Sequence, residues 1–157
     1  MGRVRRVKRV LFLDFDGVLH PATAHFAVDD VRMPIAALRA AGLFVHVDAL
    51  ADALRPFEDV GVITHSSWRL THTDSELRSL LDALGSRVIG ATDRSMDREE
   101  SIAQAVRTRD LGSDDFRVLD DQPELFVQFR GNVIACDPAR GVGDAMALDK
   151  LNEWMGR

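Results

Sequence analysis

The sequence predicts an α/β protein, a three-layer α/β/α sandwich around a mainly parallel, five-stranded sheet. Three observations support this fold class. Short apolar runs alternate along the chain with segments in which apolar residues recur at helical spacing. The runs are almost continuously apolar, as in strands buried on both faces of a parallel sheet. Helical segments separate most of the runs, and this order is typical of a sheet covered by helices on both sides.

The candidate strands share an apolar stretch that ends at acidic, polar or turn-forming residues. They are residues 10–15, 60–64, 87–91, 116–119 and 132–136. Four segments between or after them have helical spacing and a side chain suited to the N-cap position. The candidate caps are Asp48 for a helix over 48–57, Thr73 or Asp74, Asp97, and Asp144. Gly85 would end the second of these helices.

Length and composition favour a single domain, residues 1–157, with an ordinary globular core. Hydrophobic residues make up 46% and charged residues 29% of the chain, which excludes general disorder. No apolar run approaches the roughly 20 residues that span a bilayer. Cys136 is the only cysteine, so an internal disulfide and a multi-cysteine zinc site are excluded. We expect a cytoplasmic protein without a membrane partner.

The charge is unevenly distributed, although the formal net charge is only −5. Residues 1–9 form a basic arm that contains Arg3, Arg5, Arg6, Lys8 and Arg9 and no acid. Such a segment is either a patch for nucleic acid or an acidic partner, or a solvated lead into the first strand.

Acidic residues follow two of the predicted strands. Asp14 and Asp16 come after the first strand, and Asp120 and Asp121 after the fourth. Ligand sites of open parallel sheets lie beyond the carboxyl ends of the strands, so these carboxylates are expected to meet there. Their mutual repulsion calls for protons or a cation, and carboxylate oxygens suit Mg²⁺. The pattern therefore predicts a Mg²⁺ site.

The segment VLFLDFDGVL, residues 10–19, resembles the first motif of the haloacid-dehalogenase-like (HAD) hydrolases. The resemblance covers about residues 9–150 and implies a Rossmann-like sheet and phosphatase activity. It implies that Asp14 is the nucleophile that forms an aspartyl-phosphate and that Asp16 is the general acid/base. It also implies that Asp14 binds Mg²⁺ through its carboxylate and Asp16 through its main-chain carbonyl, with Gly17 at the substrate.

The segment THSSWR, residues 64–69, is similar to the second motif of small uncapped HAD phosphatases, including HAD domains of RNA-repair proteins. That motif supplies a hydroxyl that holds the phosphoryl group. Alignment on the tryptophan selects Ser66, whereas the first hydroxyl after the apolar run is Thr64. Ser67 and Arg69 would contact the substrate, and Trp68 is either a core residue or a substrate platform.

The third family motif is a lysine near the start of a later helix, and here the sequence departs from the pattern. Arg98 is the best substitute for that cation, with Arg94 second. An arginine binds phosphate in a bidentate way that an ammonium cannot reproduce. The fourth motif is well matched, and the resemblance implies that Asp120 and Asp121 complete the metal shell.

The interval between the first and second motifs is too short for a separate cap domain and leaves a small flap, residues 20–47. An open site of this kind accepts a phosphate on a small molecule or on a nucleic-acid end. His20 and His25 lie in this flap, where they either contact the substrate or, as is commoner, are exposed loop residues. The sequence thus predicts a Mg²⁺-dependent phosphomonoester hydrolase. The alternative is a catalytically silent HAD-like module that binds phosphate or a partner.

Overall fold

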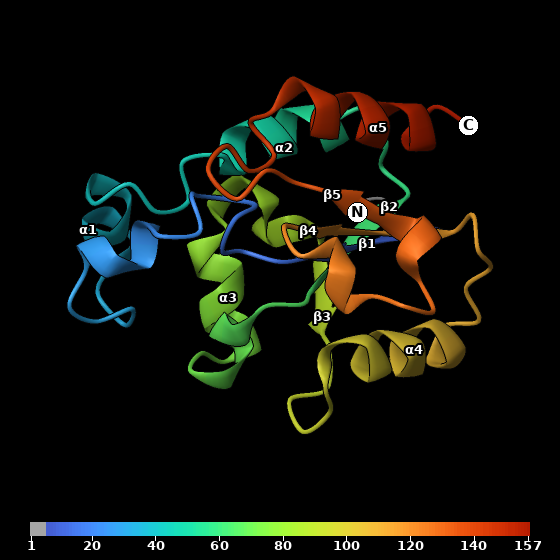
Figure 1. Cartoon of the computed structure of the whole chain (residues 1–157), viewed down its shortest axis with the longest axis horizontal. Helices are drawn as coiled ribbons and strands as arrows, with labels where there is room; N and C mark the ends of the chain where they lie inside the picture. The colour runs from blue at the N-terminus through green and yellow to red at the C-terminus, as the bar shows by residue number, and fades with distance from the viewer. Residues whose placement is uncertain (1–5) are drawn as a thin grey trace, which may run out of the picture.

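The computed structural model describes residues 6–157, in which helices cover both faces of a parallel sheet (Figure 1). The strands follow the order β3-β2-β1-β4-β5, and all neighbouring strands are parallel. Their bounds are β1 Arg9–Leu13, β2 Val60–Thr64, β3 Val88–Ala91, β4 Phe116–Asp120 and β5 Val133–Ala135. The predicted three-layer α/β/α sandwich is confirmed, and the sheet is parallel throughout.

The central strand β1 is buried on both faces, which explains why its sequence is continuously apolar. Leu11 and Leu13 point into one core cluster, whereas Val10 and Phe12 point into the other. All four side chains are at most 1% exposed. A strand with helices over both faces buries every residue, so the side chains that point to either face must be apolar.

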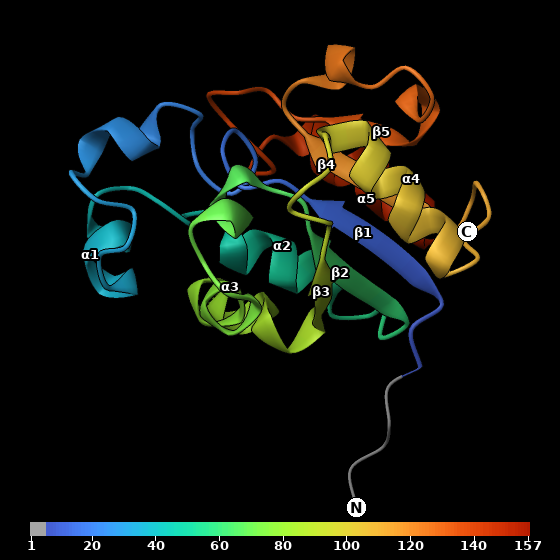
Figure 2. The ribbon, with the colours of Figure 1, turned by 90° about the horizontal axis from the view of Figure 1, so that it is seen from below.

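The helices divide between the two faces of the sheet. Figure 1 shows α2 and α5 over one face and α4 over the other, and Figure 2 shows the same sheet from below. The bounds are α1 Ile35–Ala40, α2 Val47–Leu54, α3 Asp74–Leu80, α4 Arg98–Thr108 and α5 Ala145–Met155. Helix α3 packs into the same core cluster as α2 and α5 through Leu77 and Leu80. Within residues 6–157, every helix is too short or too polar to cross a lipid bilayer.

Three of the predicted caps are confirmed and one is wrong. Thr73, Asp97 and Asp144 each accept a hydrogen bond from the first turn of their helix. Asp48 does not cap α2, because that helix begins one residue earlier, after His46, and Asp48 lies inside its first turn.

The predicted ends of two helices also differ from the structure. Helix α2 ends at Leu54 rather than at residue 57 because Pro56 has no N–H to extend the helical hydrogen bonds. Gly85 does not end α3 but lies in the following 3₁₀ helix η3, Asp82–Arg87. A Cβ at Gly85 would come within 2.5 Å of the carbonyl oxygen of Arg78, so glycine is needed there for a close approach.

The segment between β1 and α2 contains the 3₁₀ helix η1, Ala24–Ala27, and the short helix α1. In both ribbon views it lies beside α3, at the left (Figures 1 and 2). Ion pairs tie it to that side of the molecule: Arg32 to Glu76 at 2.8 Å and Arg39 to Asp82 at 3.3 Å. The segment thus forms one wall of a groove whose other wall is α3 and the loop before it.

The basic arm meets the sheet at the edge opposite the acidic strand ends. Arg9 belongs to β1, where it pairs with Asp59 at 2.8 Å and donates to the carbonyl oxygen of Met155 at 2.8 Å. Arg6 and Lys8 are exposed before that strand, and Arg3 and Arg5 lie outside the described residues.

Candidate active site

The carboxyl ends of β1 and β4 lie side by side at the point where the strand order changes direction. The register pairs Leu13 with Leu119, and the Asp14 amide donates to the Leu119 carbonyl oxygen at 3.1 Å. The next residues, Asp14 and Asp120, therefore lie next to each other beyond the last shared bonds. Ligand sites of open parallel sheets form at such switch points.

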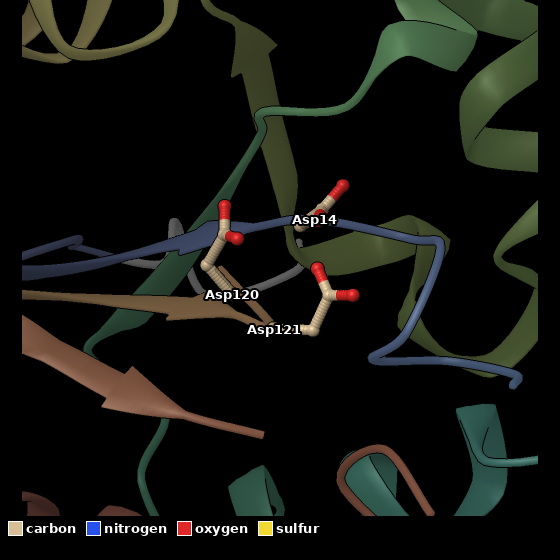
Figure 3. A group of neighbouring side chains, drawn as sticks. All are labelled: Asp14, Asp120 and Asp121. Atoms are coloured by element: carbon tan, nitrogen blue, oxygen red, sulfur yellow. The ribbon is translucent and has the colours of Figure 1, made fainter. Parts of the chain in front are cut away.

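Three carboxylates meet there, and Figure 3 shows them converging from the ends of β1 and β4. One oxygen from each of Asp14, Asp120 and Asp121 lies within 4.8 Å of the others. Asp14 is 4% exposed and Asp120 0%. Burial, with the charge of Asp120, raises the pKa of Asp14 well above its ordinary value, and burial also raises the pKa of Asp120 and of Asp121. The group favours bound protons or a bound cation.

Arg98 is the cation that touches this group. As the first residue of α4, it places Nη1 2.6 Å from an oxygen of Asp120 and 3.7 Å from one of Asp14. Arg94 points elsewhere, donating to the Arg69 carbonyl oxygen at 2.6 Å and pairing with Asp74 at 2.8 Å. Of the two arginines that the sequence left open, only Arg98 lies against the carboxylates.

Gly17 allows the loop after β1 to pack directly against Asp121. Its φ is +77°, and a Cβ on it would lie 2.2 Å from an oxygen of Asp121. Both the left-handed backbone and the close approach exclude other residues. Its amide donates to the carbonyl oxygen of His20 at 2.9 Å, which closes the loop.

Asp16 turns away from the three carboxylates into a different environment. Its Oδ1 accepts hydrogen bonds from His20 Nε2 at 2.7 Å and from Trp68 Nε1 at 3.2 Å. The Phe44 amide donates to His20 Nδ1 at 3.1 Å, so the ring proton must sit on Nε2, facing Asp16. Burial would raise the pKa of Asp16, but these hydrogen bonds outweigh it and the pKa is lowered.

The sequence did not predict the hydrogen bonds that His20 and Trp68 donate to Asp16. His20 was expected to be an exposed loop residue, but it is 0% exposed. Its partner Phe44 lies 24 residues away, and the only sequence signal was the apolar pair Val18-Leu19 just before His20. Trp68 is a buried core residue that packs on Phe44 and also hydrogen-bonds to Asp16.

The residues after β2 occupy distinct positions. Ser66 is buried and caps the 3₁₀ helix η2, Ser67–Leu70, by accepting from the Trp68 amide at 3.3 Å. Thr64 is the last residue of β2, and its hydroxyl lies 3.5 Å from the carbonyl oxygen of Gly90 in β3. Of the two hydroxyls, Ser66 is the one beyond the strand end, whereas that of Thr64 faces a neighbouring strand.

His65 is a buried residue directly after β2. Its Nδ1 lies 3.1 Å from the hydroxyl of Thr92. Burial, with the charges of Arg98 and Arg69, lowers the pKa of His65 to about 3. The ring therefore carries no charge at neutral pH.

The loop after β5 has a structural role. Asp137 accepts from the amides of Ala139 and Arg140 at 2.8 and 3.2 Å. The Val142 amide donates to the Val18 carbonyl oxygen at 2.8 Å, which holds the loop after β1 in place.

Two neighbouring cavities lie beside the site, and Asp16 lines the smaller one. A cavity of about 320 Å³ is lined by Asp16, His25, Val31, Ser67 and Trp68, among others. A cavity of about 730 Å³ is lined by Arg32, Arg69, Arg94 and the start of α3. Leu70 and Thr71 line both, so the two cavities are neighbours.

The donor set of the cluster fits a hard divalent cation. It consists of three carboxylates, two of them buried, and a single arginine contacts them within residues 6–157. Oxygen-only ligands are those that Mg²⁺ prefers. Burial raises the pKa of the nearby Cys136 thiol to about 12, so it is protonated and does not compete as a ligand.

The comparisons with known proteins agree with this geometry. Residues 10–147 match the model of a family described as the HAD domain in Swiss Army Knife RNA repair proteins. The matched segment begins in β1 and ends in α5, so it includes every residue of the site. A search of the curated proteins finds no relative that matches the chain.

Proposed function

Because the chain belongs to the family of HAD domains found in Swiss Army Knife RNA repair proteins, we propose that it is a Mg²⁺-dependent phosphomonoester hydrolase working through an aspartyl-phosphate. The family indicates a phosphatase-type hydrolase. The observation that carries the finer proposal is the group of Asp14, Asp120 and Asp121, buried at the sheet's switch point with Arg98 against it.

In the first step, a carboxylate oxygen of Asp14 attacks the phosphorus of the substrate. The bond from phosphorus to the leaving oxygen breaks, and Asp16 donates a proton to that oxygen. In the second step, Asp16 takes a proton from water, whose oxygen attacks the phosphorus of the aspartyl-phosphate. The bond from phosphorus to Asp14 breaks, which restores the carboxylate and releases inorganic phosphate.

The two-sided role of Asp16 is consistent with its environment. Its lowered pKa makes it a carboxylate in the free protein, which is the form that accepts a proton. A phosphate group beside it raises that pKa by charge repulsion, which favours the acid form when the substrate is bound. His20 and Trp68 hold one oxygen and leave the other free to face the leaving group.

The carboxylates of Asp14, Asp120 and Asp121, with the main-chain carbonyl of Asp16, would hold Mg²⁺. When bound, the ion offsets the negative charge of the phosphoryl oxygens and of the carboxylates. Arg98 adds a fixed positive charge beside Asp14 and Asp120.

Hydroxyl and backbone groups would position the phosphoryl group. We assign Ser66 to this role in preference to Thr64, because Ser66 lies beyond the end of β2. Gly17 and Ser67 would border the substrate, the latter from the cavity that Asp16 also lines. The substrate class is a nucleotide or a nucleic-acid terminal phosphate, which accords with the RNA repair proteins in which this family occurs.

The test is hydrolysis of p-nitrophenyl phosphate and a panel of phosphorylated nucleotides and oligonucleotides, with Mg²⁺ or with EDTA. We expect turnover that EDTA abolishes and that Asp14→Asn reduces to background. Asp149→Asn, the same change at an exposed position of α5, is the matched control and should retain activity. Turnover that survives Asp14→Asn, or no turnover on any ester, would overturn the proposal.

A further inference from the structure

The position of Asp16 indicates where the leaving group lies. A general acid must reach the oxygen that it protonates, so the leaving alcohol extends from the phosphoryl group toward Asp16. Asp16 lines the 320 Å³ cavity, and the 730 Å³ cavity lies next to it, because Leu70 and Thr71 line both. A leaving alcohol long enough to pass Leu70 and Thr71 would reach the lining of the larger cavity.

That lining has a surplus of positive charge. Three arginines line the cavity, together with two carboxylates. Arg32 pairs with Glu76 at 2.8 Å, and Arg94 pairs with Asp74 at 2.8 Å. Among the ion pairs within residues 6–157, none includes Arg69, so this guanidinium is the uncompensated charge of the cavity.

Arg69 is also the arginine with unused hydrogen-bonding capacity. It is 8% exposed, and its Nη1 donates to the carbonyl oxygen of Ser66 at 2.7 Å. Its Nε is buried and has no hydrogen-bond partner among the described residues. Burial and the charges of Arg98 and Arg94 lower the pKa of Arg69, and the opposing charges of Asp14 and Asp93 are smaller effects.

A buried guanidinium without an anion is costly, and the cost is recovered when a ligand supplies one. The planar donors of arginine match the oxygens of a phosphate. Asp14 and Asp93 influence Arg69 by charge from a distance but form no ion pair with it.

We infer that the cavity lined by Arg69 binds a second phosphate, carried by the leaving alcohol of the substrate. The preferred substrate is then a nucleotide whose sugar bears a phosphate besides the one that is hydrolysed. A nucleoside bisphosphate and a phosphorylated strand end share this chemistry. The inference rests on the proposed function, because Asp16 places the leaving group only if it is the acid.

The experiment compares substrates that differ only in the second phosphate. Hydrolysis of adenosine 3′,5′-bisphosphate is measured against adenosine 3′-monophosphate and adenosine 5′-monophosphate, and the products show which phosphate is removed. A dinucleotide with a 3′-phosphate tests whether a phosphodiester serves as well as a terminal phosphate. We expect kcat/KM for the bisphosphate to exceed that of the better monophosphate by about tenfold or more, the size of one charge-assisted hydrogen bond.

Two variants test the assignment to the cavity. Arg69→Gln removes the charge and should reduce the preference for the bisphosphate to about twofold or less. Leu70→Glu places a negative charge at a side chain that is 61% exposed and lines both cavities. This charge should repel the second phosphate and so reduce the preference for the bisphosphate. Met146→Glu, at an exposed position of α5 that lines neither cavity, is the matched control and should keep the preference. The ratio of two substrates on one variant is independent of how much of it is folded.

The possible results separate the inference from the function beneath it. Hydrolysis of p-nitrophenyl phosphate without preference for the bisphosphate overturns the second-phosphate site and leaves the phosphatase intact. A preference that survives both Arg69→Gln and Leu70→Glu overturns the assignment to this cavity. No hydrolysis of any ester overturns the proposed function and the inference with it.

Discussion

Asp14 and Asp16 are two residues apart in one motif, yet the fold places them in opposite environments. Asp14 is buried among carboxylates, and its pKa is raised. Asp16 is held by two N–H donors, from His20 and Trp68, and its pKa is lowered. One strand end thus provides a carboxylate that needs a cation and another that is stable as an anion without one.

Under the proposed function, this contrast would separate the role of the nucleophile from that of the acid/base. The nucleophile must lie where charge is gathered, because the phosphoryl group and the metal meet there. The acid/base must gain and lose a proton, so it must lie apart from the charges that gather around the nucleophile. The turn at Gly17, closed by the packing of Asp121 against it, is what divides the two environments.

The largest expected effect comes from removing each carboxylate in turn. Asp14→Asn should lower kcat on p-nitrophenyl phosphate to background and abolish any covalent intermediate. Asp16→Asn should lower steady turnover by about 10²–10⁴-fold, the usual size of a lost acid/base. It should nevertheless release an initial burst of p-nitrophenol, because that leaving group needs no proton. Rapid-mixing absorbance measures the burst.

The contrast between the two residues would be broken if Asp16→Asn gave no burst and Asp14→Asn gave one. Alkyl phosphates serve as the internal comparison, since their leaving oxygen requires a proton. On these esters both variants should lack a burst.

The second expected effect concerns the metal. Mg²⁺ should raise the thermal midpoint of the wild-type protein, because an ion that binds only the folded state stabilises it. Asp120→Asn should reduce Mg²⁺ affinity by at least about tenfold, since it removes a buried ligand. Asp16→Asn should change that affinity little, because the Asp16 carboxylate points to His20 and Trp68. Titration with Mg²⁺ in thermal unfolding and calorimetry measures both.

An equal loss of Mg²⁺ affinity in Asp120→Asn and Asp16→Asn would contradict the division between the two environments. The exposed Asp149→Asn variant shows how much a surface carboxylate alone contributes.

The third effect acts on Asp16 through its donors. Trp68→Phe removes the Nε1 donor together with part of the buried indole, so it should cost about 1–3 kcal/mol of stability. His20→Phe also leaves the buried Phe44 amide unpaired, which should cost about 1–3 kcal/mol. In both variants the pKa of Asp16 rises, so the acidic limb of the kcat/KM profile should move to higher pH. A loss of stability with an unchanged pH profile would show that these residues are only structural.

The sheet and the meeting of the carboxylates were predictable because their signals are local. Each strand is a short apolar run, and Asp14 and Asp120 are adjacent to the ends of two of them. The sequence ranked Arg98 ahead of Arg94, but it could not show that only Arg98 contacts the carboxylates. Both lie near the start of α4, and only the helix orientation places Arg98 against the carboxylates.

The surroundings of Asp16 were likewise out of reach of the sequence. The burial of His20 depends on the Phe44 amide, and the donor from Trp68 comes from 52 residues away. A histidine after a turn has no periodicity that marks it as buried. The environment of a residue, unlike its position at a strand end, is set by contacts between distant segments.

The smallest expected effect is the pH dependence of stability, and it has opposite signs for the two carboxylates. The folded-state pKa of Asp14 lies above its ordinary 3.8, so the folded protein keeps a proton that the unfolded chain releases, and stability falls as pH rises above 3.8. Asp14→Asn has no carboxyl group to ionise at this position, so it avoids this fall in stability. In EDTA at pH 7 it should be the more stable protein, by an amount that shrinks toward pH 4.

Asp16 should behave in the reverse way. Its folded-state pKa lies below 3.8, so its contribution is present above that pH and is lost as pH falls through the lower value. Asp16→Asn should be less stable than the wild type at pH 7, by no more than about 1 kcal/mol because Asp16 is partly exposed and its interactions are screened. Urea unfolding in EDTA between pH 3 and 7 measures both variants. If Asp14→Asn were the less stable protein at pH 7 without metal, the carboxylate cluster would not be the strained, cation-requiring site that its burial indicates.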